Sequence, residues 1–289
     1  MNELETKNLW ITGAGGLIGS SLARQSAWHS SKWTTHAWTR ANLDLTDHHE
    51  IRAAFKRTRP SLIIHCAAIS KSAACDANPT LAQQVNVEST RILCDIAGET
   101  PVWFLSTDLV FDGKAGAYPE TAEVNPLTFY GRTKVDAERH VLAHRRNAVF
   151  RLSLNGGCSP TGDRGFNEEL RRSVESGTAM KLFDDEFRCP AAAEMTAGVF
   201  WKLADLGELP RGIFHLCGGE RLSRFQIGKL LLERWGKNDS ILQSSSMRDY
   251  QGPPRSPDTS MTCGRLEALL GGSLPGLRAW LEENPTAPF

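Results

Sequence analysis

The sequence predicts an α/β fold in which a doubly wound parallel sheet carries helices on both faces. Through the first half of the 289 residues, short apolar runs alternate with segments that have helical spacing. The run LIIHCAA at 62–68 is continuously apolar, which is typical of a strand buried on both faces. Helical segments of roughly 10–20 residues separate such runs, and crossovers of this kind join parallel strands in a right-handed sense.

The first half of the chain supplies most of the expected sheet. LWIT at 9–12 is apolar and is followed at once by glycines, and the next segment, 17–28, has the spacing of a helix. Asp47 precedes another helical segment and is of a residue type that commonly begins helices. The strands are expected at 9–12, 35–39, 62–68, 102–107 and 148–154, and the helices at 17–28, 47–57, 79–98 and 128–144.

After residue 155 the alternation loosens, which predicts a second and smaller part of the molecule. We expect residues 1–155 to form the core and residues 156–289 to form mainly a C-terminal lobe, with 191–217 returning to the sheet. The Ser/Pro-rich stretch 244–260 is the longest irregular segment. The expected elements are strands at 180–183 and 212–217 and helices at 165–176, 191–205, 222–235, 264–270 and 275–283.

Composition excludes several classes of function. The 33 Lys and Arg residues balance the 33 Asp and Glu residues and are dispersed, which argues against a nucleic-acid-binding protein. No apolar run is long enough for a membrane span, and the N-terminus lacks the pattern of a signal peptide. The seven Cys residues are scattered without a C-x-x-C pair, so neither a disulfide framework nor a metal site is expected. We therefore expect a cytoplasmic protein without nucleic-acid, membrane or metal partners.

A glycine-rich loop follows the first predicted strand and opens the first predicted helix. Its spacing, G-x-x-G-x-x-G, places glycines at 13, 16 and 19. Gly13 permits a tight turn, Gly16 lets the backbone approach a pyrophosphate, and Gly19 permits close packing of helix and strand. The N–H groups at the start of the helix then face the phosphates. This context predicts a Rossmann-like dinucleotide-binding core in residues 1–155.

The end of the second strand indicates which dinucleotide is preferred. NAD enzymes place Asp or Glu there to bind the ribose 2′-OH, but the segment Trp38-Thr39-Arg40 holds no acid. The Arg40 guanidinium suits a 2′-phosphate instead, so we expect NADPH as the cofactor. NADH stays an alternative, in which Arg40 is a solvated side chain.

Tyr130 and Lys134 form the pattern Y-x-x-x-K on a predicted helix, so both side chains lie on one face. The pKa of a free phenol is about 10. A neighbouring ammonium favours the phenolate and so lowers the pKa of the tyrosine toward neutral pH. The pair follows an apolar strand that ends in Ser106-Thr107-Asp108. Because open α/β sheets bind ligands at the carboxyl ends of their strands, these residues are candidates for a catalytic group.

Several motifs together resemble a known family. They are GAGGLIG (13–19), LDLTD (43–47), RPSLIIHCAA (59–68), STDLVFDG (106–113), YPE (118–120) and YGRTK (130–134). In this order they resemble the extended short-chain dehydrogenase/reductases and are most similar to the dTDP-4-dehydrorhamnose reductase branch. The resemblance is strong over 7–155, and beyond it FDDEFRCP (183–190) and RSPDTSMTCGRL (255–266) are similar to that family's substrate-lobe segments.

The resemblance implies an NAD(P)H-dependent oxidoreductase that transfers hydride from the nicotinamide to the keto carbon of a nucleotide-linked 4-keto sugar. Tyr130 would donate the proton, Lys134 would hold the nicotinamide ribose, and Thr107 and Asp108 would match the family's catalytic hydroxyl and neighbouring acid. The implied cofactor-binding residues are Gly13, Gly16, Leu17, Ile18 and Gly19 around the pyrophosphate, Asp44 and Leu45 beside adenine, and Ala67 and Ala68 beside the nicotinamide.

Two positions depart from the family pattern and leave other functions open. Leu109 stands where the family commonly has an aromatic residue, and Leu154 stands where the rhamnose-forming enzymes have Trp. A nucleotide-sugar epimerase or dehydratase is one alternative, although dehydratases typically carry Glu at the position of Leu109. A non-catalytic NADP-binding regulatory subunit is another, because a relative in this branch regulates methionine adenosyltransferase.

The expected partner is a nucleotide-sugar substrate, and a homodimer is left open. Arg188 and Arg255 are candidates to clamp its diphosphate, because a guanidinium matches that geometry. For each of them a structural ion pair is an equal alternative.

Overall fold

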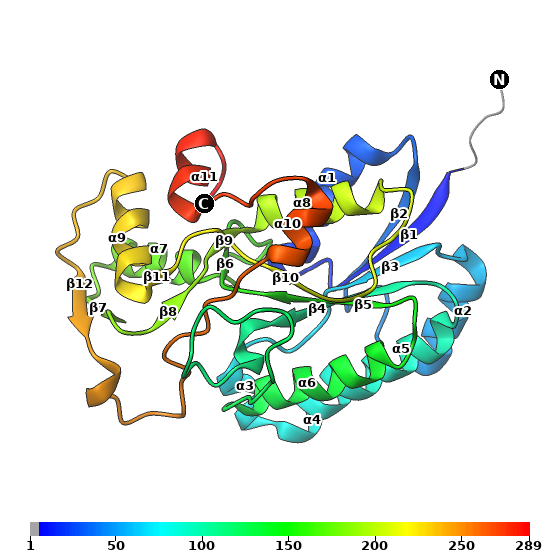
Figure 1. The fold of residues 1–289 in the computed structure, drawn as a ribbon, viewed down its shortest axis with the longest axis horizontal. Helices are drawn as coiled ribbons and strands as arrows, with labels where there is room; N and C mark the ends of the chain where they lie inside the picture. The colour runs from blue at the N-terminus through cyan, green and yellow to red at the C-terminus, as the bar shows by residue number, and fades with distance from the viewer. Residues whose placement is uncertain (1–5) are drawn as a thin grey trace.

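The structure, a computed structural model, describes residues 6–289 and is built on one six-stranded parallel sheet (Figure 1). The parallel α/β fold expected from the sequence is confirmed. The order across the sheet is β10-β5-β4-β3-β1-β2. The strands are β1 (Lys7–Thr12), β2 (Trp33–Trp38), β3 (Leu62–His65), β4 (Val102–Thr107), β5 (Ala148–Leu152) and β10 (Gly212–Leu216).

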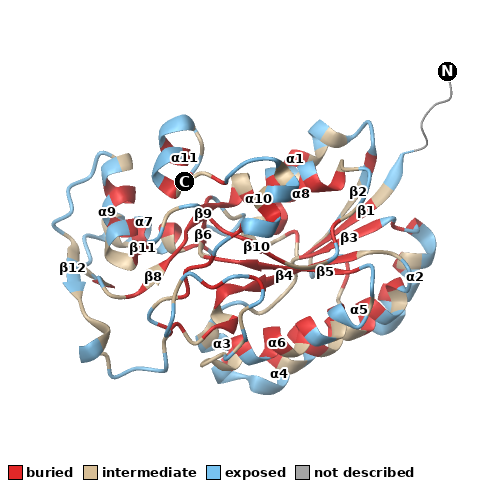
Figure 2. Cartoon of the chain, in the orientation of Figure 1, coloured by how far each residue is buried: buried red, intermediate tan, exposed pale blue. Residues whose placement is uncertain are grey.

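Helices cover both faces of this sheet (Figure 2). The inner strands β3, β4 and β5 are buried throughout, whereas the edge strand β2 is partly exposed. On one face α1 packs against α8, and on the other α5 contacts both α2 and α6. Each helix turns an apolar side toward the sheet, so two separate apolar clusters fill the two layers. The helices are α1 (Leu17–Gln25), α2 (His48–Thr58), α5 (Ser89–Ala97), α6 (Phe129–Leu142) and α8 (Ala193–Ala204), with α10 (Gly264–Leu270) beside β10.

The order in which the chain adds strands reverses at β1, which lies between β2 and β3. From β1 the chain first builds outward to β2 and then crosses back to β3 on the other side. Such a switch point leaves a crevice at the carboxyl ends of the strands, where open α/β sheets bind ligands. The turns after β1 and β3 therefore flank the place where a ligand is expected.

A lobe lies beside the carboxyl edge of the sheet and has its own apolar cluster, which includes Leu170, Leu231 and Trp280 (Figure 1). Its helices are α7 (Phe166–Ser176), α9 (Arg224–Arg234) and α11 (Leu277–Glu283). Three two-stranded sheets complete it: β6 (Asn155–Gly156) with β9 (Ala191–Ala192), β7 (Met180–Phe183) with β12 (Leu242–Ser245), and β8 (Phe187–Arg188) with β11 (Leu222–Ser223).

Some local expectations were wrong in detail. The helix expected at 79–98 is interrupted by a π-helical turn, η2 (Gln84–Glu88), which separates α4 (Pro79–Gln83) from α5. Helix α3 (Ser72–Ala77) had no clear periodicity and was not expected. Part of the chain expected to be helical at 17–28 tightens into the 3-10 turn η1 (Ser26–His29). Two further 3-10 turns are η3 (Asp108–Val110) and η4 (Met247–Asp249).

Two expected absences can be compared with the structure over residues 6–289. In that range no helix combines the length and the apolar character that crossing a membrane requires. In the same range no group of three or more His, Cys, Asp or Glu side chains is arranged to hold a metal ion.

Candidate active site

The glycine loop between β1 and α1 is shaped by backbone contacts. Gly13 has a positive φ of 68°, and a Cβ placed on it would lie 2.6 Å from the backbone nitrogen of Ala67. A Cβ on Gly19 would overlap the carbonyl of Gly13, so only glycine lets α1 start this close to β1. Helix α1 has Gly16 as its N-cap, with no side-chain cap and no acid in the first turn. Its first N–H groups are therefore available to an anion.

One cavity of about 400 Å³ lies beside the glycine loop and the carboxyl end of β2. Arg40 is exposed at its wall, and the predicted adenine neighbours Asp44 and Leu45 line it. The Asp44 carboxylate accepts hydrogen bonds from the backbone and side chain of Thr46, at 2.9 and 2.8 Å, which lower the pKa of Asp44. Asp44 thus shapes the turn beside the cavity. Of the two residues implied to lie beside the nicotinamide, Ala67 lines this cavity only, whereas Ala68 also lines the second cavity described below.

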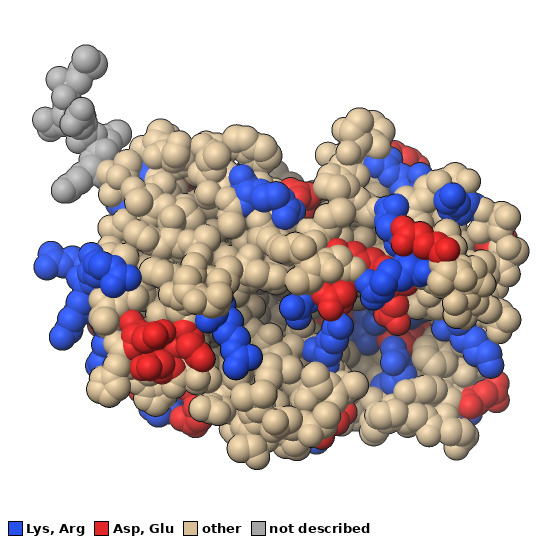
Figure 3. All heavy atoms as spheres, turned by 180° about the vertical axis from the view of Figure 1, so that it is seen from behind, with Lys and Arg blue, Asp and Glu red and all other residues tan. Residues whose placement is uncertain are grey.

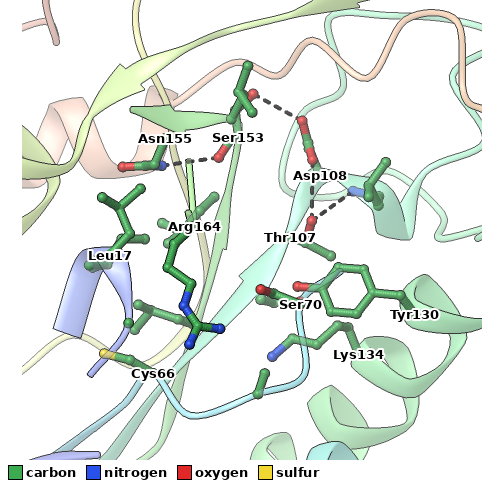
Figure 4. Close-up of a pocket in the computed structure, with 18 of the residues that line it drawn as sticks. Leu17, Cys66, Ser70, Thr107, Asp108, Tyr130, Lys134, Ser153, Asn155 and Arg164 are labelled. Carbon is green, nitrogen blue, oxygen red and sulfur yellow. Dashed lines mark hydrogen bonds between the residues drawn. The ribbon is translucent and has the colours of Figure 1, made fainter. Parts of the chain in front are cut away.

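A second cavity, of about 300 Å³, lies at the carboxyl end of β4 against α6. The structure brings Thr107, Asp108, Tyr130 and Lys134 together in its wall, with the glycine loop at its other end (Figure 4). The predicted residues Leu17, Ile18 and Gly19 also line it. The two cavities adjoin, because both are lined by Gly13, Gly16, Cys66, Ala68, Ser70 and Arg164.

Local sequence explains how α6 presents its side chains. Thr128 is the N-cap of α6 and accepts a hydrogen bond from the backbone N–H of Gly131 at 3.0 Å. A Cβ on Gly131 would overlap the carbonyl of Leu109, so this glycine lets the first turn of α6 approach the turn after β4. Tyr130 and Lys134 then follow one another on the cavity side of the helix. Gly131 was not identified from the sequence, although its place inside Y-x-x-x-K was a usable signal.

The titration of the Tyr130–Lys134 pair differs from the sequence-based expectation. Both are buried, with exposed fractions of 8% and 2%. Burial raises the pKa of Tyr130 above its ordinary value, and the nearby Asp108 carboxylate adds to this increase. Burial also lowers the pKa of Lys134 to about 7, although Glu138 opposes the shift. Tyr130 therefore keeps its proton at neutral pH, instead of being drawn toward the phenolate by Lys134.

Asp108 connects the sheet to the lobe. Its Oδ2 accepts hydrogen bonds from Ser153 and Thr259, each at 3.0 Å, and from Arg188 at 3.3 Å. Thr107 donates to Oδ1 of Asp108 at 3.3 Å and accepts from the backbone N–H of Leu109 at 3.2 Å. These bonds hold the plane of the Asp108 carboxylate in one orientation beside Thr107.

Behind Asp108 lies a cluster of three arginines around Glu186. The Glu186 side chain has no exposed surface and Arg188 is buried, whereas Arg224 and Arg255 are partly exposed. Glu186 pairs with Arg188 at 3.1 Å, with Arg224 at 3.2 Å and with Arg255 at 2.7 Å. Burial opposes ionisation of Glu186, but the three guanidinium groups together lower its pKa to about 2. With Asp108 the cluster holds three cations against two anions, so its net charge is +1.

The two predicted diphosphate ligands have different positions in this cluster. Arg188 lines the second cavity, but its guanidinium also bonds Asp108, Glu186 and Thr259. Arg255 is not among the residues that line either cavity, and it pairs with Glu186. Arg224, which the sequence did not single out, does line the second cavity. No motif marks Arg224, so only the packing of the lobe reveals it.

Leu109 and Leu154, the two departures from the family pattern, both line the second cavity. They supply apolar wall where the pattern has aromatic side chains. In the space-filling view the molecule is hollowed between sheet and lobe, and Lys and Arg side chains gather around this hollow (Figure 3). A ligand with both an anionic part and a less polar ring suits such a lining.

Comparison with known proteins supplies independent information. A family model described as RmlD substrate binding domain matches residues 7–285. A probable low-salt glycan biosynthesis reductase, Agl14, from Haloferax volcanii is 29% identical over 284 residues, which cover 93% of this chain and 94% of that protein. Methionine adenosyltransferase 2 subunit beta from Xenopus laevis is 26% identical over 286 residues, which cover 95% of this chain and 86% of that protein.

A solved structure shares the whole fold. The crystal structure of dTDP-4-dehydrorhamnose reductase from Bacillus anthracis in complex with NADP superposes with a TM-score of 0.87 at 21% identity. The superposition covers 96% of this chain and 98% of that one, so it includes both the sheet and the lobe.

Proposed function

The chain belongs to the RmlD substrate binding domain family, and from this membership we propose that it is an NADPH-dependent reductase of a nucleotide-linked 4-keto sugar. The observation that carries the proposal is the convergence of Thr107, Tyr130 and Lys134 in one cavity that ends at the glycine loop. Two comparisons support it: one relative is described as a probable reductase, and a structure of the same fold contains NADP.

The residues present fit a dinucleotide. The two adjoining cavities, of about 400 and 300 Å³, offer room for an adenosine half and a nicotinamide half on either side of the glycine loop. The uncapped start of α1 lies where these cavities meet and suits the pyrophosphate. Arg40 would contact the 2′-phosphate, and Lys134 would hold the nicotinamide ribose. When bound, the reduced nicotinamide supplies the hydride.

Residues of this chain then supply the proton. Tyr130 holds its proton at neutral pH, because burial and the Asp108 carboxylate disfavour the phenolate. It therefore acts as the acid that protonates the carbonyl oxygen as negative charge develops there. To contact the same oxygen, the Thr107 hydroxyl would turn its one proton from Asp108 to the sugar, while it keeps the hydrogen bond that it accepts from the backbone N–H of Leu109. The buried walls exclude water, which strengthens these interactions.

Incubation of the wild-type protein with NADPH and a panel of nucleotide-linked 4-keto sugars tests this proposal. Oxidation of NADPH, followed by its absorbance, with formation of the 4-hydroxy sugar in equal amount, is the expected result. An isomerised or dehydrated sugar without net consumption of NADPH would indicate the epimerase or dehydratase alternative instead.

A regulatory role is the second candidate, and the similarity to methionine adenosyltransferase 2 subunit beta favours it. The apolar Leu109 and Leu154 in the cavity wall are compatible with relaxed demands on a sugar. If the protein binds NADPH tightly, reduces no sugar of the panel and co-elutes with a methionine adenosyltransferase catalytic subunit, this candidate replaces the reductase.

A further inference from the structure

The loop 158–165, between β6 and α7, reaches from the lobe to the glycine loop. Gly157 precedes the loop and Gly165 is its last residue, and both glycines lie beside Leu17, the first residue of α1. A Cβ placed on Gly157 would lie 3.6 Å from Cδ1 of Leu17, and one on Gly165 would lie 3.6 Å from Cδ2. The loop is thus packed against the start of the helix whose N–H groups face a pyrophosphate.

One buried carboxylate organises this loop. Glu168 on α7 accepts hydrogen bonds from the backbone N–H of Ser159 at 2.6 Å, of Arg164 at 2.7 Å and of Gly165 at 2.9 Å. The Ser159 hydroxyl donates a further bond to it at 2.9 Å. Because these bonds hold the backbone on both sides of the loop, the Arg164 side chain starts from a defined position.

Arg164 lines both cavities, and Figure 4 shows its side chain projecting into the second of them. It is the one charged residue that the two cavities share. About half of the side chain, 49%, is exposed, and its Nε contacts Thr161 at 3.1 Å and Asp163 at 3.3 Å. These contacts use one edge of the guanidinium and leave its terminal N–H groups for a ligand.

We propose that the Arg164 guanidinium binds the pyrophosphate of the dinucleotide and holds it against the uncapped N-terminus of α1. We call this contact between Arg164 and the pyrophosphate the clasp. The inference rests on the proposed function, because it requires a dinucleotide in the adjoining cavities. The charges are complementary: α1 presents N–H groups without an acid in its first turn, Arg164 faces the same space, and the ligand brings two negative phosphates.

The clasp joins the lobe to the cofactor. Asp163 pairs with Lys71, which follows β3 on the opposite side of the crevice, at 3.9 Å. A pyrophosphate held by Arg164 would add a second link across the same gap. The loop that carries Arg164 would then be ordered by the cofactor, so we expect NADPH to protect residues 158–165 from hydrogen exchange.

Cofactor affinities of three variants test the clasp. Arg164→Ala should weaken NADPH binding about tenfold, since a charge-assisted contact is lost at a half-exposed site. Binding of adenosine 2′-monophosphate, which has no pyrophosphate, should not change. Arg164→Lys should have an intermediate affinity, because one ammonium replaces a planar fork. Arg145→Ala is the matched control, because its loss changes the net charge equally. Exposed Arg145 precedes β5 and so lies at the amino ends of the strands, away from both cavities.

The possible outcomes separate the clasp from the proposed function. Equal NADPH affinity of wild type and Arg164→Ala would overturn the clasp alone, as would a variant that raises only the KM for the sugar. Equal weakening of NADPH and of adenosine 2′-monophosphate would assign Arg164 to the adenosine half and also overturn it. A wild type that binds no dinucleotide would overturn both. Circular dichroism melting curves that match the wild type would show that Arg164→Ala folds normally.

Discussion

The proposed cofactor side of the crevice is shaped by backbone contacts, whereas the proposed substrate side is built from charged side chains that pair with one another. At the glycine loop, contacts of Gly13 and Gly19 with neighbouring backbone set the shape, and no side chain caps α1. On the lobe side, Asp108 and Glu186 are surrounded by arginines and hydroxyl groups.

The two sides are therefore expected to respond differently to substitution. Backbone N–H groups bind a pyrophosphate whatever the neighbouring side chains are, and their arrangement depends on a few glycines. Substitution of other residues in the loop should therefore leave pyrophosphate binding intact. A buried charge network depends on every partner, because removing one charge leaves another buried and unpaired. Substrate preference is therefore expected to change through single residues of the lobe, such as Arg224, and cofactor binding through the loop after β1.

The largest expected effect concerns the group that acts between the two sides. Tyr130→Phe keeps the buried ring but removes the hydroxyl, so turnover should fall about 10²–10⁴-fold while NADPH affinity stays near that of the wild type. Single-turnover kinetics on an accepted sugar, with cofactor titration in parallel, measures both. A variant with wild-type turnover would show that the proton comes from elsewhere.

The substrate side should respond strongly in stability. Glu186→Gln leaves buried Arg188 and the partly exposed Arg224 and Arg255 without their shared anion, so the free energy of unfolding should fall by about 3 kcal/mol. Urea denaturation measures this loss, with Glu282→Gln on exposed α11 surface as the control.

The same network has a pH signature. The pKa of Glu186 falls from 4.5 to about 2 on folding, so its contribution is fully present above pH 4.5 and is lost as pH falls toward 2. Glu186→Gln should flatten the stability curve over this window. An unchanged slope would mean that Glu186 is not ionised in the folded protein.

On the cofactor side a single exposed residue is expected to have a moderate effect. Arg40→Ala should weaken NADPH about tenfold and leave NADH affinity unchanged, because only NADPH carries the 2′-phosphate. Titration of both cofactors against both proteins checks this. Equal affinities of the wild type for the two cofactors would contradict the assigned role.

The smallest expected change in stability is a gain. The pKa of Lys134 falls from 10.5 to about 7 on folding, so the unfolded chain binds the extra proton between these values and stability rises with pH there. Lys134→Met removes a cation that is costly to bury, and the pKa difference alone corresponds to about 4 kcal/mol at pH 7. The substitution also removes the contact of the ammonium with the Phe104 ring, 3.8 Å from the ring centroid, which is worth about 2 kcal/mol when buried. The free energy of unfolding should therefore rise by about 2 kcal/mol at pH 7. This gain should vanish toward pH 10.5, while NADPH affinity decreases. Urea denaturation across this pH range measures it.

The sequence predicted the parts of the site that depend on short-range order. The glycine spacing in 13–19 and the i, i+4 spacing of Tyr130 and Lys134 are local properties, and strand followed by helix places them at one edge of the sheet. Continuous apolar runs such as 62–68 likewise predicted the parallel sheet. The π-helical turn η2 was missed because it keeps a helix-like apolar pattern while changing only the hydrogen bonding.

The contacts of Arg188 and Thr259 with Asp108 could be found only in the tertiary structure. Arg188 lies 80 positions along the chain from Asp108, and Thr259 lies 151 positions from it. Neither distance leaves a periodic pattern, so nothing in the sequence separates Arg224, which lines the cavity, from Arg255, which does not.

The titration of Tyr130 was also decided by the fold. Its pKa depends on how much water the walls exclude, and the i, i+4 neighbour Lys134 loses much of its own charge to the same burial. By itself the sequence determined the fold class and the glycine loop, because local spacing and apolar runs encode them. Packing between distant segments decided the charges, since burial and pairing arise only when those segments meet.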